Sequence, residues 1–265
     1  GNDRDRERRP HAPPLGVPPR LVEQPGVGPP QVPQTLAADT GDGWRLTGAK
    51  TYVLDTAAAE RFYVYARTGS GTAIFAVERT APGLEISGSN TVDQTRKQGT
   101  LTLAGTPARL VGSADGGAAV LAHALDIASV ALVAEQAGGA THAMRMAADY
   151  ARTRFQFGRA IGSFQAVKHM CADMLIEIDA TRVAVMFAAM TADDPAELAV
   201  TAPLVKAQAA DTFKLCAANA IQVHGGIAFT WEHDLHLYFR RAKTTEALFG
   251  SSSHNRALLA DRIGI

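Results

Sequence analysis

The chain has 265 residues, of which 46% are hydrophobic, and its 26 Lys and Arg side chains balance its 26 Asp and Glu side chains. A chain of this length can bury one large core or two modest ones. The formal net charge of zero gives no electrostatic reason to expect a nucleic acid or an anionic membrane as a partner. No apolar run is expected to reach the roughly 18–20 residues that span a bilayer.

Two cysteines, Cys171 and Cys216, lie inside apolar patterns of helical period and form no CxxC motif. Cysteines in such patterns are typical of buried structural thiols. Together with the lack of an apolar signal core at the start of the sequence, they favour a cytoplasmic location.

Residues 1–38 are rich in Arg and Pro and show neither the period of a strand nor that of a helix, which predicts a disordered tail. Residues 39–112 are expected to form a small antiparallel β domain. Its runs Phe62–Ala66 and Thr72–Val77 are β-branched and aromatic, and a glycine-containing turn separates them.

From residue 113 to residue 265 the apolar residues recur with a period of 3.6, which predicts a four-helix bundle and an α+β fold. Gly138 and Gly139 lie inside the first helix, where each costs about 1 kcal/mol relative to alanine, and they indicate close approach by a helix or a ligand. The expected helices run over about 117–152, from an N-cap at Ser163, from near Pro203 to Gly225, and over about 246–262 after a short piece at 234–239.

Polar residues follow the first helix and begin the second. Arg154 precedes Phe157, and its guanidinium could hold a pyrophosphate or could simply offset the helix dipole. Gln165 falls in the first turn of the second helix, where it could bond an adenine edge or remain an exposed helix glutamine. Both readings stay open for each residue.

The end of the third helix carries two glycines, Gly225 and Gly226, shortly after Gln222. Glycines there could cap the helix or admit a ligand close to the backbone. The following turn, Trp231–Asp234, contains Glu and His, but its spacing differs from that of helical histidine pairs that bind metals. We therefore expect a capping turn and no metal site.

Three blocks follow one another at helix-sized intervals: RFQFGRAIGSFQ at 154–165, QVHGGIAF at 222–229 and RRAKTTEALFGS at 240–251. In this order they resemble the C-terminal domain of the acyl-CoA dehydrogenase family. The segment GWRLTGAKTYV at 43–53 resembles the family's strand that covers the flavin, and the turn WEHD at 231–234 looks most like actinobacterial members. The resemblance covers about residues 39–265, without the family's N-terminal helical domain.

The resemblance implies a flavoprotein that dehydrogenates an acyl-CoA thioester, with FAD as the hydride acceptor and an electron-transfer protein as the next acceptor. In the family, the Arg and Gln at positions 154 and 165 reach the FAD of a neighbouring subunit, so the resemblance also implies an oligomer. The FAD-binding residues that it implies are Arg154, Phe157, Gln165, Gln222, Gly225, Gly226 and Tyr52.

The chain departs from the family at the catalytic base. The usual base is a Glu directly before a Gly-Ser or Gly-Thr pair, and Phe249 stands there in this sequence. Some members place the Glu on the first bundle helix, where this chain has Ala128. The nearest acids, Glu246 and Asp126, are weak candidates for a displaced base. Leu54 also replaces the hydroxyl residue that usually bonds the flavin.

Three hypotheses follow from these departures. In the first, the chain is the base-less subunit of a mixed complex and shares an FAD site with a paralogue that carries the Glu. In the second, it is an active homo-oligomer with a displaced base. In the third, it is a non-catalytic scaffold that has lost FAD.

Overall fold

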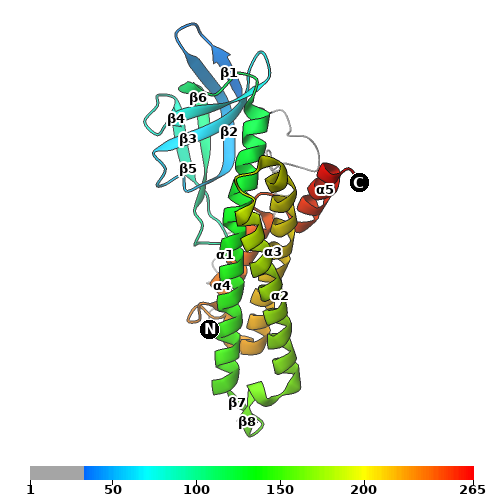
Figure 1. The fold of residues 1–265 in the computed structure, drawn as a ribbon. Helices are drawn as coiled ribbons and strands as arrows, with labels where there is room; N and C mark the ends of the chain where they lie inside the picture. Colours follow the sequence, from blue (N-terminus) through cyan, green and yellow to red (C-terminus); the bar gives the residue numbers. More distant parts are fainter. Residues whose placement is uncertain (1–32) are drawn as a thin grey trace, which may run out of the picture.

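The computed structural model describes residues 33–265, so most of the predicted tail lies outside the described residues. The first strand already begins at Leu36, inside the range predicted for the tail. Figure 1 shows a β domain at one end of the molecule and a bundle of long helices that extends away from it. This arrangement confirms the predicted α+β fold of a β domain followed by helices.

The β domain is a six-stranded sheet in the order β2-β1-β3-β4-β6-β5, and an additional β2–β6 pairing closes it on itself. All strand pairings are antiparallel except the one between β1 and β3, which corrects the expectation of a purely antiparallel sheet. The strands are β1 (Leu36–Asp39), β2 (Trp44–Leu54), β3 (Arg61–Arg67), β4 (Thr72–Glu78), β5 (Leu84–Gly88) and β6 (Gln98–Val111).

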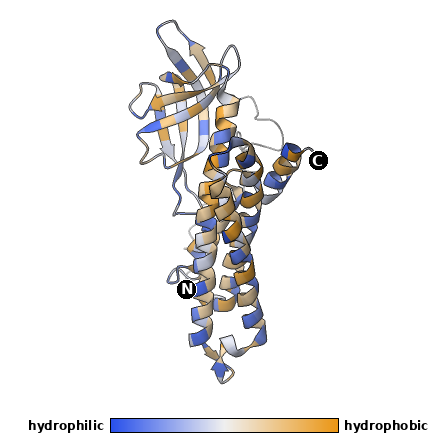
Figure 2. Ribbon diagram, viewed as in Figure 1, coloured by the Kyte–Doolittle hydropathy of each residue, from blue (hydrophilic) through white to orange (hydrophobic). Residues whose placement is uncertain are grey.

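The alternation in β3 shows why this sequence forms a sheet with one buried face. Phe62 and Val64 are buried in the β-domain core, whereas Tyr63 between them is 64% exposed. Successive side chains of a strand point to opposite faces, so the period-2 pattern places the apolar residues inside. The same mixing of hydrophobic and hydrophilic positions is visible over the strands in Figure 2.

The helical part contains three long helices and two shorter ones. The long helices α1, α2 and α3 run side by side, and a short hairpin joins α1 to α2 at the end farthest from the β domain (Figure 1). The elements are α1 (Gly117–Thr153), β7 (Phe155–Gln156), β8 (Arg159–Ala160), η1 (Ile161–Ser163), α2 (Gln165–Met190), α3 (Pro195–His224), η2 (Gly225–Phe229), α4 (Leu235–Ala247) and α5 (Ser252–Ile263).

The predicted start of the third helix near Pro203 was wrong. Asp194 accepts hydrogen bonds from the backbone N–H groups of Ala196 and Glu197, so α3 begins at Pro195. Pro203 lies inside the helix and has no N–H to offer the carbonyl of Ala199. That carbonyl instead accepts a hydrogen bond from Arg262 Nη1 at 2.5 Å, which lets the helix continue through the proline.

Two further helix boundaries differ from the prediction. The helix expected over about 246–262 is interrupted: α4 ends at Ala247, and α5 begins at Ser252 after Ser251 caps it by accepting from the N–H of His254. Ser163 does not cap the second helix, because its hydroxyl donates to the carbonyl of Ala160. The described residues therefore form five α-helices: the short piece expected at 234–239 is the beginning of α4, and α5 takes the place of the helix expected over about 246–262.

The glycine pair in α1 serves helix packing at one of its two positions. A Cβ atom on Gly139 would lie 2.5 Å from the ring of Phe213 on α3, so only glycine allows this close approach. A Cβ on Gly138 would meet no described atom within 4 Å. The approach of a helix therefore explains Gly139 and leaves Gly138 unexplained.

By length and composition alone, α1 could cross a membrane, which corrects the expectation that no segment is apolar enough. A single helix of this kind is weak evidence, because a core helix of a soluble protein meets the same criterion. In this fold α1 packs along α2 and α3 and buries a stripe of alanines in the bundle core.

Candidate functional site

The hairpin between α1 and α2 is a tight turn that displays an aromatic ring. Phe157 and Gly158 form the turn with φ values of 54° and 75°, and the Phe157 side chain is 91% exposed. Its ring meets the edge of Phe164 at 6.2 Å between centroids, and the guanidinium of Arg159 stacks on Phe164 at 4.0 Å. These contacts fix the hairpin against the start of α2.

Arg154 combines a fixed backbone with an exposed side chain. Its N–H donates to the carbonyl of Tyr150, and its own carbonyl accepts from the N–H of Ile161. The side chain lies on the surface, as does that of Gln165 at the first position of α2. An exposed arginine whose backbone is fixed in this way can present two parallel N–H donors of its guanidinium to a phosphate.

The end of α3 leaves its backbone open to a ligand. Gly225 adopts a φ of 66°, and a Cβ atom on Gly225 or Gly226 would meet no described atom within 4 Å. Gln222 is exposed one turn earlier. Polar backbone that faces open space beside a surface glutamine suits an extended polar cofactor, so the residues present here fit the expected group.

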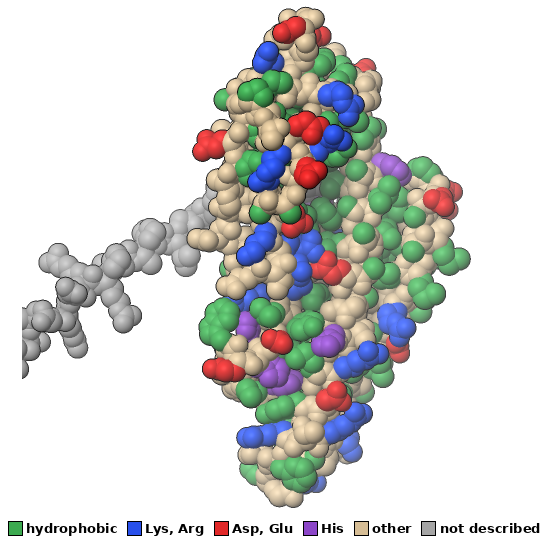
Figure 3. Space-filling view, turned by 90° about the vertical axis from the view of Figure 1, so that its left-hand side faces the viewer, with side chains coloured by type: hydrophobic (Ala, Val, Ile, Leu, Met, Phe, Trp, Pro, Cys, Tyr) green, Lys and Arg blue, Asp and Glu red, His purple; other side chains and the backbone are tan. Residues whose placement is uncertain are grey.

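His224 joins this end of α3 to the end of α1. Its ring stacks on Tyr150 at 4.3 Å between centroids, and its Nδ1 lies 2.8 Å from the carbonyl oxygen of Ala220. Burial lowers the pKa of His224, which favours the neutral ring. Because Tyr150 lies one turn before Arg154, this contact places Arg154 and Gly225 at the same end of the bundle. Figure 3 shows histidines gathering on the bundle below the β domain.

Tyr52 lies in the other part of the molecule, at an irregularity of β2. The register between β2 and β6 shifts between Lys50 and Val53, and Tyr52 adopts a φ of 56° there. A left-handed backbone at an aromatic residue is uncommon and redirects the side chain. Tyr52 is 39% exposed, so a stacking surface remains available.

A turn of four residues, 248–251, connects α4 to α5 and contains the position expected for a base. Phe249 is half-buried with a φ of 58°, and Gly250 is buried with a φ of 95°. Two buried side chains donate to the backbone of this turn. Lys206 Nζ lies 3.1 Å from the carbonyl oxygen of Gly250, and Asn255 Nδ2 lies 3.0 Å from the same oxygen.

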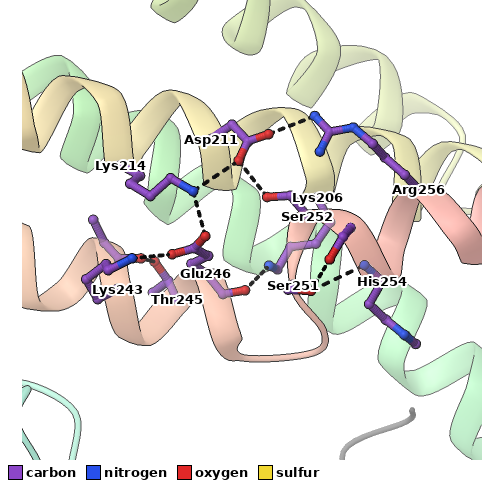
Figure 4. A network of polar contacts seen from close by, with 12 residues as sticks. Lys206, Asp211, Lys214, Lys243, Thr245, Glu246, Ser251, Ser252, His254 and Arg256 are labelled. Atoms are coloured by element: carbon purple, nitrogen blue, oxygen red, sulfur yellow. Dashed lines mark hydrogen bonds and ion pairs between the residues drawn. The ribbon is translucent and has the colours of Figure 1, made fainter. Parts of the chain in front are cut away.

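Lys206 was not predicted from the sequence, although a signal was present. It is a single cation within the apolar run AVTAPLVKAQAA at 199–210, and it is fully buried in the fold. Burial lowers the pKa of Lys206 to about 8, and the carboxylates of Glu246 and Asp211 only partly offset this effect. Figure 4 shows its ammonium group pointing at the turn.

Glu246, one of the two weak base candidates, is held by two lysines. Its carboxylate accepts from Lys214 Nζ at 2.7 Å and from Lys243 Nζ at 2.9 Å (Figure 4). Burial raises the pKa of Glu246, but the hydrogen bonds from the two lysines outweigh it and hold the pKa below its ordinary value. Glu246 is therefore a stabilised anion in an ion-pair network rather than a free base.

Asp126, the other weak candidate, is also paired. It is buried on α1, and its carboxylate lies 2.9 Å from Arg262 Nη1 of α5. Burial raises the pKa of Asp126, and the hydrogen bond from Arg262 opposes that shift. Ala128 follows on the same helix and is half-buried. The structure thus gives both acids a structural partner.

Arginines on α4 tie the bundle to the β domain. Arg240 Nη1 donates to the carbonyl of Val92 at 3.2 Å, and Arg241 Nη2 donates to the carbonyl of Thr95 at 3.2 Å. Arg241 also pairs with Glu135 of α1 at 3.4 Å. Because α4 leads into the turn at 248–251, these contacts fix the turn relative to the β domain.

The two groups of candidate residues lie far apart along α3. Lys206, which holds the turn, precedes His224 by 18 residues (from 206 to 224), or about 27 Å of helix. Arg154, Gln222 and the glycines lie around the end of α3 at His224, whereas Phe249 lies near Lys206. The predicted site residues therefore form two clusters, one at the far end of the bundle and one near the β domain.

The comparisons identify the family. The model of the acyl-CoA dehydrogenase C-terminal domain matches residues 115–264, more than half of the chain. The chain therefore belongs to the acyl-CoA dehydrogenase family, as the sequence blocks indicated. Similarity to a Mycobacterium tuberculosis relative confirms the resemblance to actinobacterial members.

Three similar proteins cover most of the chain. The acyl-CoA dehydrogenase FadE27 of Mycobacterium tuberculosis is 36% identical over 86% of this chain and 61% of its own length. A steroid acyl-CoA dehydrogenase structure, the Tcur3481–Tcur3483 G363A variant, is 35% identical over 92% of this chain and 66% of that chain, with a TM-score of 0.80. The structure of the ChsE4–ChsE5 complex from Mycobacterium tuberculosis is 34% identical over 92% of this chain and 64% of that chain, with a TM-score of 0.78. The chain spans less than two thirds of FadE27.

Proposed function

We propose that this chain is the base-less subunit of a mixed acyl-CoA dehydrogenase and completes an FAD site with a paralogue that carries the catalytic Glu. One observation carries the proposal: the turn that would present the base holds Phe249, and the nearby acids Glu246 and Asp126 are engaged by cations. Removal of an α-proton needs a carboxylate within hydrogen-bond reach of it. A phenyl ring cannot accept that proton.

In this proposal the far end of the bundle binds the ADP part of FAD. Arg154 donates to the pyrophosphate, where a charge-assisted bidentate contact is about twice as strong as a neutral one. Gln165 and Gln222 form hydrogen bonds with polar edges of the cofactor, and Phe157 packs against it. Gly225 and Gly226 let the cofactor approach the backbone. Their exposure and the open space beside the glycines support this role.

In the β domain, Tyr52 of β2 would stack on the flavin. FAD, when bound, supplies the hydride-accepting chemistry, and the protein supplies orientation and excludes water. Because about 27 Å of α3 separates Lys206 from His224, one chain presents its two clusters at widely spaced places. This spacing supports a site assembled from more than one subunit.

The bundle also offers a surface for a partner subunit. Exposed apolar side chains on α2 include Ile176 at 66%, Val183 at 69%, Met186 at 67% and Met190 at 82%. An apolar face of this kind is unusual on a soluble monomer and is typical of an interaction surface. We assign this face to oligomer contacts. The paired names of two similar structures support a complex of two different chains.

The substrate class in this proposal is an acyl-CoA thioester, and the steroid acyl-CoA dehydrogenase among the similar structures favours a steroid side chain over a simple fatty acid. Electrons would pass from the flavin to an electron-transfer protein. We place the complex in the cytoplasm, in line with two cysteines that are both free.

Two alternatives remain distinguishable. An active homo-oligomer would use Asp126 or Glu246 as a displaced base, and the ion pairs of both residues argue against it. In a scaffold without FAD, Arg154 would only offset the dipole of α1, and the flavin content of the purified complex distinguishes this alternative.

The proposed function is tested by expressing the chain alone and together with a paralogue that has Glu before its Gly-Ser or Gly-Thr pair. We expect the two chains to purify together in equal amounts with bound flavin, measured from visible absorbance. Co-expression with a paralogue that also lacks the Glu serves as the control. A colourless complex, or a chain that assembles only with itself, would contradict the proposal.

A further inference from the structure

The turn at 248–251 has a backbone that the local sequence alone does not favour. Phe249 adopts a φ of 58°, although only glycine enters this region without steric cost. For other residues the left-handed conformation costs roughly 1–2 kcal/mol. Such a conformation persists where the surrounding structure holds it in place, and this often happens at functional sites.

Two buried donors hold this turn. Lys206 Nζ donates to the carbonyl oxygens of Gly250 at 3.1 Å and Glu246 at 3.4 Å. Asn255 Nδ2 donates to the carbonyl oxygens of Gly250 and Ser251, both at 3.0 Å, and to that of Phe249 at 3.4 Å. The carbonyls of residues 249–251 thus all meet a side-chain donor.

The ammonium group of Lys206 bonds backbone carbonyls and no carboxylate of the described residues, although two carboxylates are nearby. Lys206 is fully buried, and a buried ammonium is costly unless it is well bonded. The carboxylates of Glu246 and Asp211 are nearby, yet they bond Lys214, Lys243, Ser252 and Arg256. The ammonium of Lys206 is directed to backbone carbonyls instead, as Figure 4 shows.

We propose that Lys206 and Asn255 are positioning residues: they fix the turn at 248–251 and thereby the direction in which the residue 249 side chain faces the acyl thioester. The proposal rests on the proposed function, because it takes this turn as a wall of the acyl-CoA site. Phe249 then shapes the pocket with an apolar ring at a fixed place. Loosening the turn would weaken acyl-CoA binding without affecting the FAD-binding cluster about 27 Å away along α3.

The test uses the co-purified complex with the paralogue and three variants of this chain. Lys206→Met keeps the length of the side chain and removes its donors, whereas Lys206→Gln retains an N–H donor. Lys168→Met, at an exposed lysine of α2, is the matched control. The readouts are amide hydrogen exchange at Gly250 and Asn255, the Kd of an unreactive acyl-CoA thioether, and flavin content.

For Lys206→Met we expect about tenfold faster exchange at the two amides and about tenfold weaker thioether binding, with flavin content unchanged. Lys206→Gln should recover part of both losses, and Lys168→Met should behave as the wild type. Faster exchange with unchanged thioether binding would overturn the positioning role. A wild-type complex that binds no thioether would instead overturn the proposed function, and the exchange data would still report whether Lys206 holds the turn.

Discussion

The Nη1 atom of Arg262 lies 2.9 Å from a carboxylate oxygen of Asp126, and this pair joins the last helix to the first. The same Nη1 atom donates to the carbonyl of Ala199, which Pro203 leaves without its usual helical partner. A single guanidinium therefore neutralises a buried acid and completes the backbone hydrogen bonding of α3. Asp126 is accordingly part of the framework of the bundle.

Replacing Arg262 by Met should destabilise the fold by about 2–4 kcal/mol, because it leaves the buried Asp126 carboxylate and the half-buried Ala199 carbonyl without their partner. The matched variant Arg256→Met breaks the more exposed pair with Asp211 and should cost less than about 1 kcal/mol. Urea unfolding followed by circular dichroism measures both. Equal losses in the two variants would show that Arg262 contributes no more than a surface ion pair.

The lowered pKa of Lys206 predicts that the free energy of unfolding rises at alkaline pH. Its pKa is lowered to about 8 in the fold by burial, whereas an unfolded lysine titrates near 10.4. Between these values the unfolded chain binds more protons than the folded chain, so stability increases as pH rises. Below pH 8 the buried ammonium destabilises the folded state in full. As pH rises toward 10.4 this destabilisation falls by up to about 3 kcal/mol.

The measurement compares the wild type with Lys206→Met by urea unfolding between pH 7 and pH 10.5. His254, Asp211 and Glu246 face Lys206, and their ordinary titrations fall below this range. The other groups that titrate here are shared by both proteins, so the difference curve isolates Lys206. We expect the free energy of unfolding of the wild type to rise relative to that of Lys206→Met as pH rises, and a difference that does not change with pH would rule out a depressed lysine pKa.

Replacing Arg154 by Ala should weaken FAD binding by about 1.5–3 kcal/mol, the contribution of a hydrogen bond to a charged group. The melting temperature without flavin should change little, because the side chain is exposed. Arg152→Ala, two residues earlier on the same helix end, removes an exposed cation that pairs with Asp149 and serves as the control. Equal flavin content in both variants would leave Arg154 with only a helix-end role.

Introducing a charge on the apolar face of α2 should disrupt the oligomer. Met186→Glu places a carboxylate at a side chain that is 67% exposed in the isolated chain and buried in the proposed interface. Tyr63→Glu makes the same kind of change at a β-domain residue that is 64% exposed. Light scattering should report a smaller species for the Met186 variant alone, whereas an unchanged mass would place the interface elsewhere.

Sequence patterns predicted the β domain and the three long helices, whereas the candidate residues at the far end of the bundle were implied by the family resemblance. They did so because period 2 in β3 and period 3.6 in α1 reflect local burial of one face. The start of α3 was misjudged because proline is favoured in the first turn of a helix, whereas Pro203 lies inside α3 and the distant Arg262 donates to the carbonyl that the proline leaves without its usual partner. The break between α4 and α5 was missed because the turn there is held by Lys206, which lies 44 residues before Gly250 in the chain.

The role of Lys206 depends on contacts that no local pattern contains. It meets the carbonyl of Gly250, 44 residues later in the chain, and its burial results from the packing of α3 against α4 and α5. Likewise, the pairing of Asp126 with Arg262 links residues 136 positions apart. Sequence reasoning could name the two acids as candidates, but only the fold shows that both are engaged.

Turnover of an acyl-CoA with a dye acceptor, measured for this chain alone and for its complex with the Glu-bearing paralogue, tests the central claim most directly. Because Phe249 and Ala128 occupy the two expected base positions, the chain alone should show little or no turnover. The complex should turn over, and replacing the paralogue's Glu by Gln should abolish that activity. Turnover by the chain alone at the rate of the complex would contradict the account.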